Sequence, residues 1–208
     1  MVNWAEIKWG AHRWVILAVF ALFASVAIAA PQRSVAYFPF VLGDNAISPE
    51  GYSLEEALTK GFLADFNKDK RFSVNEFSRS NPGVKRALNE GSIPASLLLA
   101  PFTGRHGNEF KGITLGRLMR AELSIAGIVE KLSYDAAKKT SALVVSLEIF
   151  DVKAGKVLGI VSLTANGTGD DKTIAAKSAV AEFVKLGVVQ VIAILTAPPK
   201  PKSSGGGG

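Results

Sequence analysis

The sequence predicts an α/β (α+β) fold, in which helices pack on a mixed sheet that ends in a three-stranded antiparallel meander. Three observations support this. Short apolar, strand-like runs alternate with amphipathic helical segments between residues 34 and 122. Three strand-like segments then follow one another with only polar joints between them, and a long apolar helical stripe comes last. One hydrophobic helix is expected at the N-terminus, before the domain.

The domain is expected to open with a strand and a helix. The apolar, aromatic-rich run 34–41 predicts a buried strand, and Pro39 within it predicts an irregular end or an edge position. Ser53 predicts the N-cap of a helix with an acidic first turn. Apolar residues then repeat along one face of that helix, at Leu54, Leu58, Phe62 and Phe66.

A second strand and a second helix are expected next. Residues 71–76 alternate as a short strand does. Residues 82–89 predict a short helix, because Pro82 stands near its start and Gly91 just past its end.

Two further segments complete this half of the domain. The apolar run 96–100 predicts a third strand. Residues 114–122 predict a helix that buries one side, formed by Leu115, Leu118 and Met119.

The second half predicts an antiparallel meander followed by a long helix. Gly155 suits a hairpin turn, and an Asn-Gly pair at 166–167 predicts another turn, although it also matches a glycosylation acceptor. Asp170 and Asp171 predict the cap of a helix that runs to about Leu195. The three expected strands are 124–134, 140–152 and 156–167.

The composition excludes several classes of site. The chain has 208 residues, 48% of them apolar, with no Cys and two His. Without Cys there is no disulfide, thiolate zinc site, iron–sulfur cluster, thiol nucleophile or lipid-bearing cysteine. Two histidines cannot form a multi-histidine metal site. No nucleophile–base pair, Walker motif or Rossmann glycine pattern is present, so we expect neither catalysis nor a cofactor.

The first thirty residues are expected to be a signal peptide or an uncleaved membrane anchor. Lys8 and Arg13 precede an apolar run at 14–30, and small residues near its end suit cleavage after Ala29. An uncleaved anchor is the alternative, since Trp is enriched at membrane interfaces. Three Trp recur every five residues in this segment, at Trp4, Trp9 and Trp14. In either case the domain is exported, periplasmic or periplasm-facing.

The remaining chain divides into one domain and a tail. Residues 31–196 are expected to form a single envelope domain, and residues 197–208 a disordered tail rich in Pro and Gly. The net charge of +6 is spread through the chain without a long basic block, so no nucleic acid is expected as a partner. This charge supports a weak attraction to anionic surfaces.

One segment resembles a calcium-binding loop. Residues 65–76 place oxygen-bearing side chains at the spacing of an EF-hand, at Asp65, Asn67, Asp69, Ser73 and Glu76. Against calcium, Lys70 stands where the loop needs Gly, and Lys68 and Arg71 add further positive charge. The alternative is a helix end, a polar turn and a strand whose Phe72 and Val74 face the core.

Several segments carry a resemblance to a known family. Residues 35–40, 58–74, 115–122, 125–129 and 149–158 resemble, in order, motifs of CsgG-like proteins and of the amino-terminal domain of TolB. The resemblance implies a bacterial cell-envelope domain that works in assembly or secretion through protein contacts. Two features depart from the curli-secretion channel, because this chain has no lipid-bearing Cys and no long hairpins to form a pore.

We therefore expect a non-enzymatic exported protein that acts through protein–protein contacts, as an adaptor or scaffold. One alternative is a membrane-anchored accessory subunit of a larger membrane complex, and another is a calcium-binding module built on 65–76. Its partners would be other envelope or membrane proteins, the membrane itself through residues 14–30, or a second copy of the chain. The expected interaction surfaces are an exposed sheet edge and the loop 103–111, which contains His106.

Overall fold

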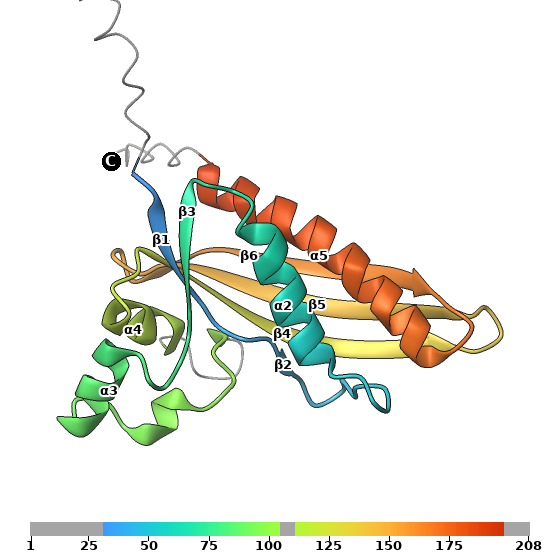
Figure 1. Ribbon diagram of the computed structural model, residues 1–208, viewed down its shortest axis with the longest axis horizontal. Coiled ribbons are helices and arrows are strands. Elements are labelled where there is room, and N and C mark those ends of the chain that lie inside the picture. The colour runs from blue at the N-terminus through green and yellow to red at the C-terminus, as the bar shows by residue number, and fades with distance from the viewer. Residues whose placement is uncertain (1–30, 105–110, 198–208) are drawn as a thin grey trace, which may run out of the picture. The chain divides into compact units, whose positions relative to one another are not determined.

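The computed structural model describes residues 31–104 and 111–197. The chain divides into two units, Met1–Pro31 and Gln32–Gly208. The described residues of the second unit form a six-stranded mixed sheet with helices on both faces (Figure 1). This confirms the predicted fold class. The predicted N-terminal hydrophobic helix lies outside the described residues.

The sheet has the order β3-β1-β4-β5-β6, and β2 also pairs with β4. β1 runs parallel to both of its neighbours, whereas β4, β5 and β6 form the predicted antiparallel meander. The strands are β1 (Arg33–Tyr37), β2 (Val41–Leu42), β3 (Phe72–Glu76), β4 (Leu123–Asp135), β5 (Thr140–Asp151) and β6 (Lys156–Thr168).

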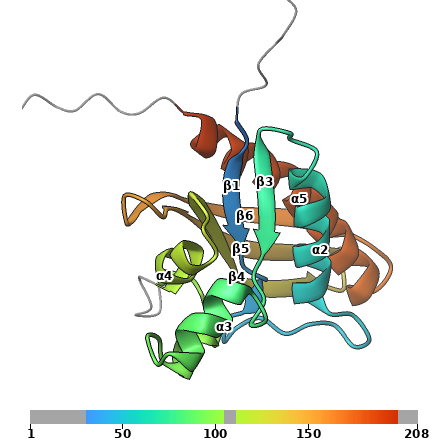
Figure 2. The same ribbon diagram turned by 60° about the vertical axis from the view of Figure 1, so that its left-hand side comes forward.

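The helices divide between the two faces of the sheet (Figure 2). One face is covered by α2 (Leu54–Phe66) and α5 (Lys172–Thr196). The other is covered by α3 (Pro82–Asn89), the 3₁₀ helix η1 (Ala95–Leu98) and α4 (Lys111–Leu118). As predicted, Ser53 caps α2 by accepting a hydrogen bond from the amide of Glu56, and Asp171 caps α5 in the same way.

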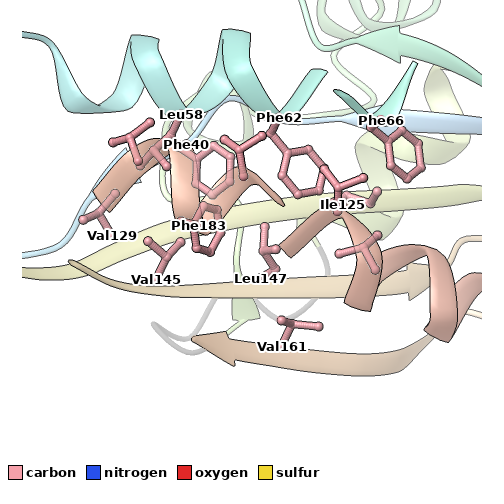
Figure 3. Close-up of a cluster of buried hydrophobic side chains, with 14 of the residues drawn as sticks. Phe40, Leu58, Phe62, Phe66, Ile125, Val129, Val145, Leu147, Val161 and Phe183 are labelled. Atoms are coloured by element: carbon pink, nitrogen blue, oxygen red, sulfur yellow. The ribbon is translucent and has the colours of Figure 1, made fainter. Parts of the chain in front are cut away.

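The larger core lies between the sheet and the pair α2 and α5 (Figure 3). Phe40 meets Phe62 and Phe183 edge to face, with ring centroids 6.0 and 5.8 Å apart. Such edge-to-face pairs add about 1 kcal/mol each to the burial of the rings. The predicted apolar stripe of α2 is fully buried here.

Contact between α5 and β6 depends on a glycine that the sequence assigned to a turn. That prediction is wrong: Asn166 and Gly167 lie within β6 and pair with Ala142 and Ser141. A methyl group on Gly167 would overlap the carbonyl oxygen of Ala175 and the amide nitrogen of Ala179. Glycine is therefore required by the close approach of α5, not by a turn.

Three other predictions need correction. The predicted strand 34–41 is divided into β1 and β2, and the irregularity expected at Pro39 is confirmed, since Pro39 has no N–H to donate to a ladder. The predicted strand 96–100 instead contains the 3₁₀ helix η1, in which Leu98 is buried, and the residue after it, Leu99, is exposed. A short apolar run has the same composition in either structure, and periodicity does not separate the two.

The helix predicted over 114–122 is α4, which begins earlier and ends at Leu118. The amide of Arg120 donates to the carbonyl of Arg117, and that of Ala121 to Gly116. Arg120 has a φ of 57°. This is a Schellman ending in which Arg stands where Gly is usual, and it escapes prediction for that reason.

We expect Gly167→Ala to lower the free energy of unfolding by about 3 kcal/mol, because α5 must move away from β6 to admit the methyl group. Urea unfolding followed by circular dichroism measures this. Asn166→Ala is the control, since the side chain of Asn166 is exposed on the same strand. Equal stability of the two variants would contradict the close approach.

Candidate interaction surface

The candidate calcium residues form an ion-paired turn between α2 and β3. Arg71 donates to the carboxylate of Asp69 through Nε, Nη2 and its backbone amide, and these hydrogen bonds lower the pKa of Asp69. Lys68 forms an ion pair with Asp65, and Lys70 donates to the backbone carbonyl of Asn67. Both aspartates are thus occupied by cations of the same turn.

The strand carries the remaining candidates away from that turn. Ser73 and Glu76 lie on β3, which pairs with β1 along its whole length, up to Tyr37 opposite Glu76. Four steps of extended strand, about 13 Å, separate Phe72 from Glu76. Within 31–104 and 111–197, no group of three or more His, Asp or Glu side chains is placed to hold a metal ion. The arrangement matches the predicted alternative of helix end, turn and strand, with Phe72 buried.

The other predicted site residues lie outside the described residues. These are Trp4, Trp9 and Trp14, together with most of the loop 103–111, including His106. The start of that loop is described. Thr103 is buried, and the amide of Gly104 donates to Oε2 of Glu148 at 2.5 Å.

Glu148 is a buried carboxylate that sequence reasoning missed. It lies in the middle of β5 and is 3% exposed, facing the α4 side of the sheet. The alternation of β5 carried the signal, since Val145, Leu147 and Ile149 face the larger core and the residues between them face the other way. Glu148 fixes the start of the loop 103–111 to the sheet.

The outer edge of β6 is the exposed apolar feature of the sheet. Among the described residues β6 pairs only with β5, so its other edge offers unpaired backbone groups over 13 residues. Three apolar side chains stand exposed along its first half: Val157 at 47%, Leu158 at 37% and Ile160 at 49%. This stretch, residues 157–160, is called the β6 edge below.

The register shows which face of the sheet two of these side chains occupy. Val157 lies opposite Phe150 and Ile160 opposite Glu148, both of which are buried on the α4 side of the sheet. A register shift falls between Ile149 and Phe150, so Leu158 has no partner on β5. A bulge of this kind leaves one residue unpaired, bends the strand and re-aims a side chain.

The opposite edge of the sheet has a different character. β3 has five residues, and Ser73, Asn75 and Glu76 are exposed on it. A short polar edge discourages pairing with another chain, whereas a long edge with apolar side chains invites it. The geometry thus favours the β6 edge over the β3 edge as an interaction surface.

Two shallow cavities lie elsewhere on the domain. One, of about 310 Å³, lies between α3 and the end of α4, and Arg86 and Arg120 are its charged lining residues. The other, of about 350 Å³, lies beside β2, and Asp44 is its charged lining residue. Neither lining contains a nucleophile beside a base, as hydrolytic or transfer chemistry would require.

One described helix, α5, is long and apolar enough to cross a membrane. Ten of its residues are buried against the sheet and α2, among them Phe183 and Val191. In the domain it serves as a core helix.

Comparison with known proteins establishes the fold alone. No family model and no curated protein matches the chain. The hypothetical protein CT253 from Chlamydia trachomatis is similar over 81% of this chain and 100% of its own, with 15% identity and a TM-score of 0.55. Protein XCC0632 from Xanthomonas campestris is similar over 79% of this chain and 86% of its own, with 8% identity and a TM-score of 0.50.

TolB from Acinetobacter baumannii is also similar. The match covers 80% of this chain and 29% of TolB, with 15% identity and a TM-score of 0.42. At that score it carries no functional argument. The resemblance to CsgG-like proteins stays a prediction.

We expect millimolar Ca²⁺ to produce neither binding heat nor a shift in the melting temperature, because Arg71 and Lys68 occupy the carboxylates of the turn. Isothermal titration calorimetry and thermal unfolding measure this. A saturable heat that disappears in Asp69→Asn would contradict it and restore the calcium hypothesis.

We expect Glu148→Ala to lower the free energy of unfolding by about 2 kcal/mol, since the amide of Gly104 loses its acceptor. Glu148→Gln keeps an oxygen there and should lose less. Urea unfolding compares the two, with exposed Glu90→Ala as the control. Equal losses for Ala and Gln would show that Glu148 does not act as this acceptor.

Proposed function

We propose that this chain is an exported, non-catalytic protein of the cell envelope that acts by binding other envelope proteins. The observation that carries the proposal is the β6 edge, a long unpaired strand edge with exposed apolar side chains. The proposal joins this surface to the export signal in the sequence and to the absence of catalytic geometry in the described residues.

Export rests on the order of charge and hydrophobicity near the N-terminus. Lys8 and Arg13 precede the apolar run 14–30, and positive charge is retained on the cytoplasmic side of a membrane. The domain that follows Pro31 is then delivered to the other side. The absence of Cys agrees with either redox environment and does not decide the compartment.

A binding role rests on the chemistry of the β6 edge. A partner strand that pairs with β6 would satisfy its outward backbone groups, and Val157 and Ile160 would add apolar contact on one face. The exposed neighbours on that face are polar, at Ser162, Thr164 and Asn166. A partner would therefore bury its apolar side chains at the first half of β6.

A second candidate is a membrane-anchored subunit of a larger membrane complex. The spacing of Trp4, Trp9 and Trp14 favours it, because a cleaved leader has no need of interfacial tryptophans. In this candidate the β6 edge still binds the partner, and residues 14–30 hold the domain at the membrane.

Native mass spectrometry of the tagged chain, taken from gently solubilised membranes of its own host, separates these candidates. A chain lacking its first 29 residues supports a free exported domain, whereas an intact chain supports an anchored subunit. Additional subunits in the assembly support the binding role, and multiples of one mass indicate a homo-oligomer. A chain that is intact, cytoplasmic and alone would contradict the proposal.

We expect Ile160→Lys to reduce the assembled fraction about tenfold, because a charge would enter the apolar contact at the β6 edge. Native mass spectrometry measures the ratio of assembly to free chain. Ile174→Lys is the matched control, since Ile174 on α5 is also 49% exposed and receives the same change. An equal effect of both variants, or none of either, would contradict binding at β6.

A further inference from the structure

We propose that one end of the domain is a basic surface that binds the anionic headgroups of a lipid bilayer. This end, called the basic end, is formed where β1, β3, β4 and β6 begin and where β5 and α5 finish (Figure 1, upper left of the domain). The proposal deepens the proposed function, since it rests on residues 14–30 holding the chain at a membrane.

Hydrogen bonds bring these segments together. The amide of Arg33 donates to the carbonyl of Arg71 at 2.9 Å, which joins β1 to the turn before β3. The amide of Glu122 donates to the carbonyl of Ser34 at 3.0 Å, which joins the turn before β4. On the other side, Nη1 of Arg33 donates to the carbonyl of Leu195 at the end of α5, also at 3.0 Å.

The β5–β6 turn completes the basic end. The amide of Val152 donates to the carbonyl of Glu122 at 3.0 Å, and Asp151 pairs with Lys156 across the hairpin. Nε of Arg117 donates to the carbonyl of Val152. The turn, the end of α4 and the start of β1 thus share one end of the sheet.

Positive charge dominates this end. Eight cationic side chains lie on its segments: Arg33, Lys68, Lys70, Arg71, Arg117, Arg120, Lys153 and Lys156. Four carboxylates lie among them: Asp65, Asp69, Glu122 and Asp151. Three of the carboxylates are held in ion pairs with Lys68, Arg71 and Arg33. The other five cations are exposed, so an excess of positive charge faces solvent.

The opposite end of the domain is acidic. It contains the loop before α2, the start of α2, the β4–β5 turn and the start of α5 (Figure 1, right). Seven carboxylates stand there: Asp44, Glu50, Glu55, Glu56, Asp135, Asp170 and Asp171. Five lysines accompany them: Lys60, Lys138, Lys139, Lys172 and Lys177. The domain therefore has an electrostatic polarity along the sheet that would orient it at an anionic surface.

Arg33, at the basic end, follows the apolar run 14–30 by three residues in the sequence. Three peptide units separate Ala30 from Arg33, which is about 10 Å at full extension. That is close to the distance over which salt screens charges at physiological ionic strength, about 8 Å. Juxtamembrane clusters of Lys and Arg bind anionic lipids over such distances.

Arg120 contributes an exposed cation to the basic end in an unusual backbone conformation. Its φ of 57° is a conformation that Gly adopts freely and that an Arg backbone adopts at a cost. Its side chain is exposed, and no packing within the described residues explains the choice of Arg over Gly. Lys139, at the acidic end, has a similar φ of 52°, so a cation in this conformation is not confined to the basic end.

The test uses the full chain, whose lack of Cys permits labelling at single introduced cysteines. Asn67→Cys reports on the basic end and Ala137→Cys on the acidic end; both positions are exposed in turns. Each labelled chain is added to phosphatidylcholine vesicles with or without phosphatidylglycerol, and a headgroup-attached quencher measures its proximity. We expect phosphatidylglycerol to increase quenching at position 67 but not at 137, and high salt to reverse the increase.

Flotation of the same vesicles separates this inference from the proposed membrane retention. A chain that floats with both vesicles and shows equal quenching in both is held by residues 14–30 alone. That outcome would overturn the proposal of a basic lipid-binding surface. A chain that floats only with phosphatidylglycerol supports the basic surface and contradicts retention by residues 14–30. A chain that floats with neither overturns both.

A matched pair of variants tests which end matters. Arg120→Gly and Lys139→Gly each remove one cation, and both residues have positive φ, at 57° and 52°. The domain counts as docked when the label at position 67 is quenched by the vesicle. We expect Arg120→Gly to lower the ratio of docked to undocked domain about fivefold. Its melting temperature should be at least as high as that of the parent chain. Lys139→Gly should leave docking unchanged. Equal effects would show that net charge alone acts and would overturn the proposal.

Inorganic phosphate at constant ionic strength distinguishes a bilayer from a single anion. We expect phosphate to leave docking unchanged when chloride is replaced. Release of the domain by phosphate would overturn the bilayer proposal in favour of a single-anion site.

Discussion

The hydrogen bonding of β1 is the constraint on which the rest of the structure depends. β1 is bonded on both sides, to β3 and to β4, and both pairings are parallel. Parallel strands need crossover connections that lie on a face of the sheet, and these supply α2 on one side and α3, η1 and α4 on the other. Because Val35 and Tyr37 face one core and Ala36 and Phe38 the other, both cores are built on this strand.

The same constraint decides where the charges gather. Parallel pairing puts the starts of β1, β3 and β4 at one end, and the antiparallel meander returns the β5–β6 turn to it. The cations of the basic end are spread from Arg33 to Lys156 in the sequence. The sequence contains no long basic block, and its short cluster at 68–71 counted only as an argument against calcium. The patch exists because of the topology.

Periodicity in the sequence was sufficient for the elements that bury one regular face. The helix from Leu54 to Phe66, the short helix from Pro82 and the three strands of the meander were predicted within a residue or two. Prediction failed where packing overrides local pattern. The sequence around Gly167 predicts a turn, but the contact of α5 with β6 is what requires glycine there. The apolar run around Leu98 predicts a strand, but tertiary packing makes it a 3₁₀ helix. Glu148 shows a third limit, because a carboxylate in an apolar strand signals burial without naming the group it binds.

The position of the β6 edge relative to the basic end gives the two surfaces a common geometry. Lys156 belongs to the basic end, and the exposed side chains of Val157 and Ile160 follow it directly on the same strand. If the basic end faces a bilayer, the apolar part of β6 is held beside the headgroups and its polar part, from Ser162 onward, points away from them. A partner strand that pairs with β6 would then meet the domain at the membrane surface. Charges stay hydrated because their burial is costly, so their attraction to the lipid surface would set the orientation of the domain. Apolar contact is not directional, so β6 would supply the affinity for the partner. A soluble partner would need only the β6 edge, whereas a partner in the membrane would need the β6 edge and the orientation set by the basic end.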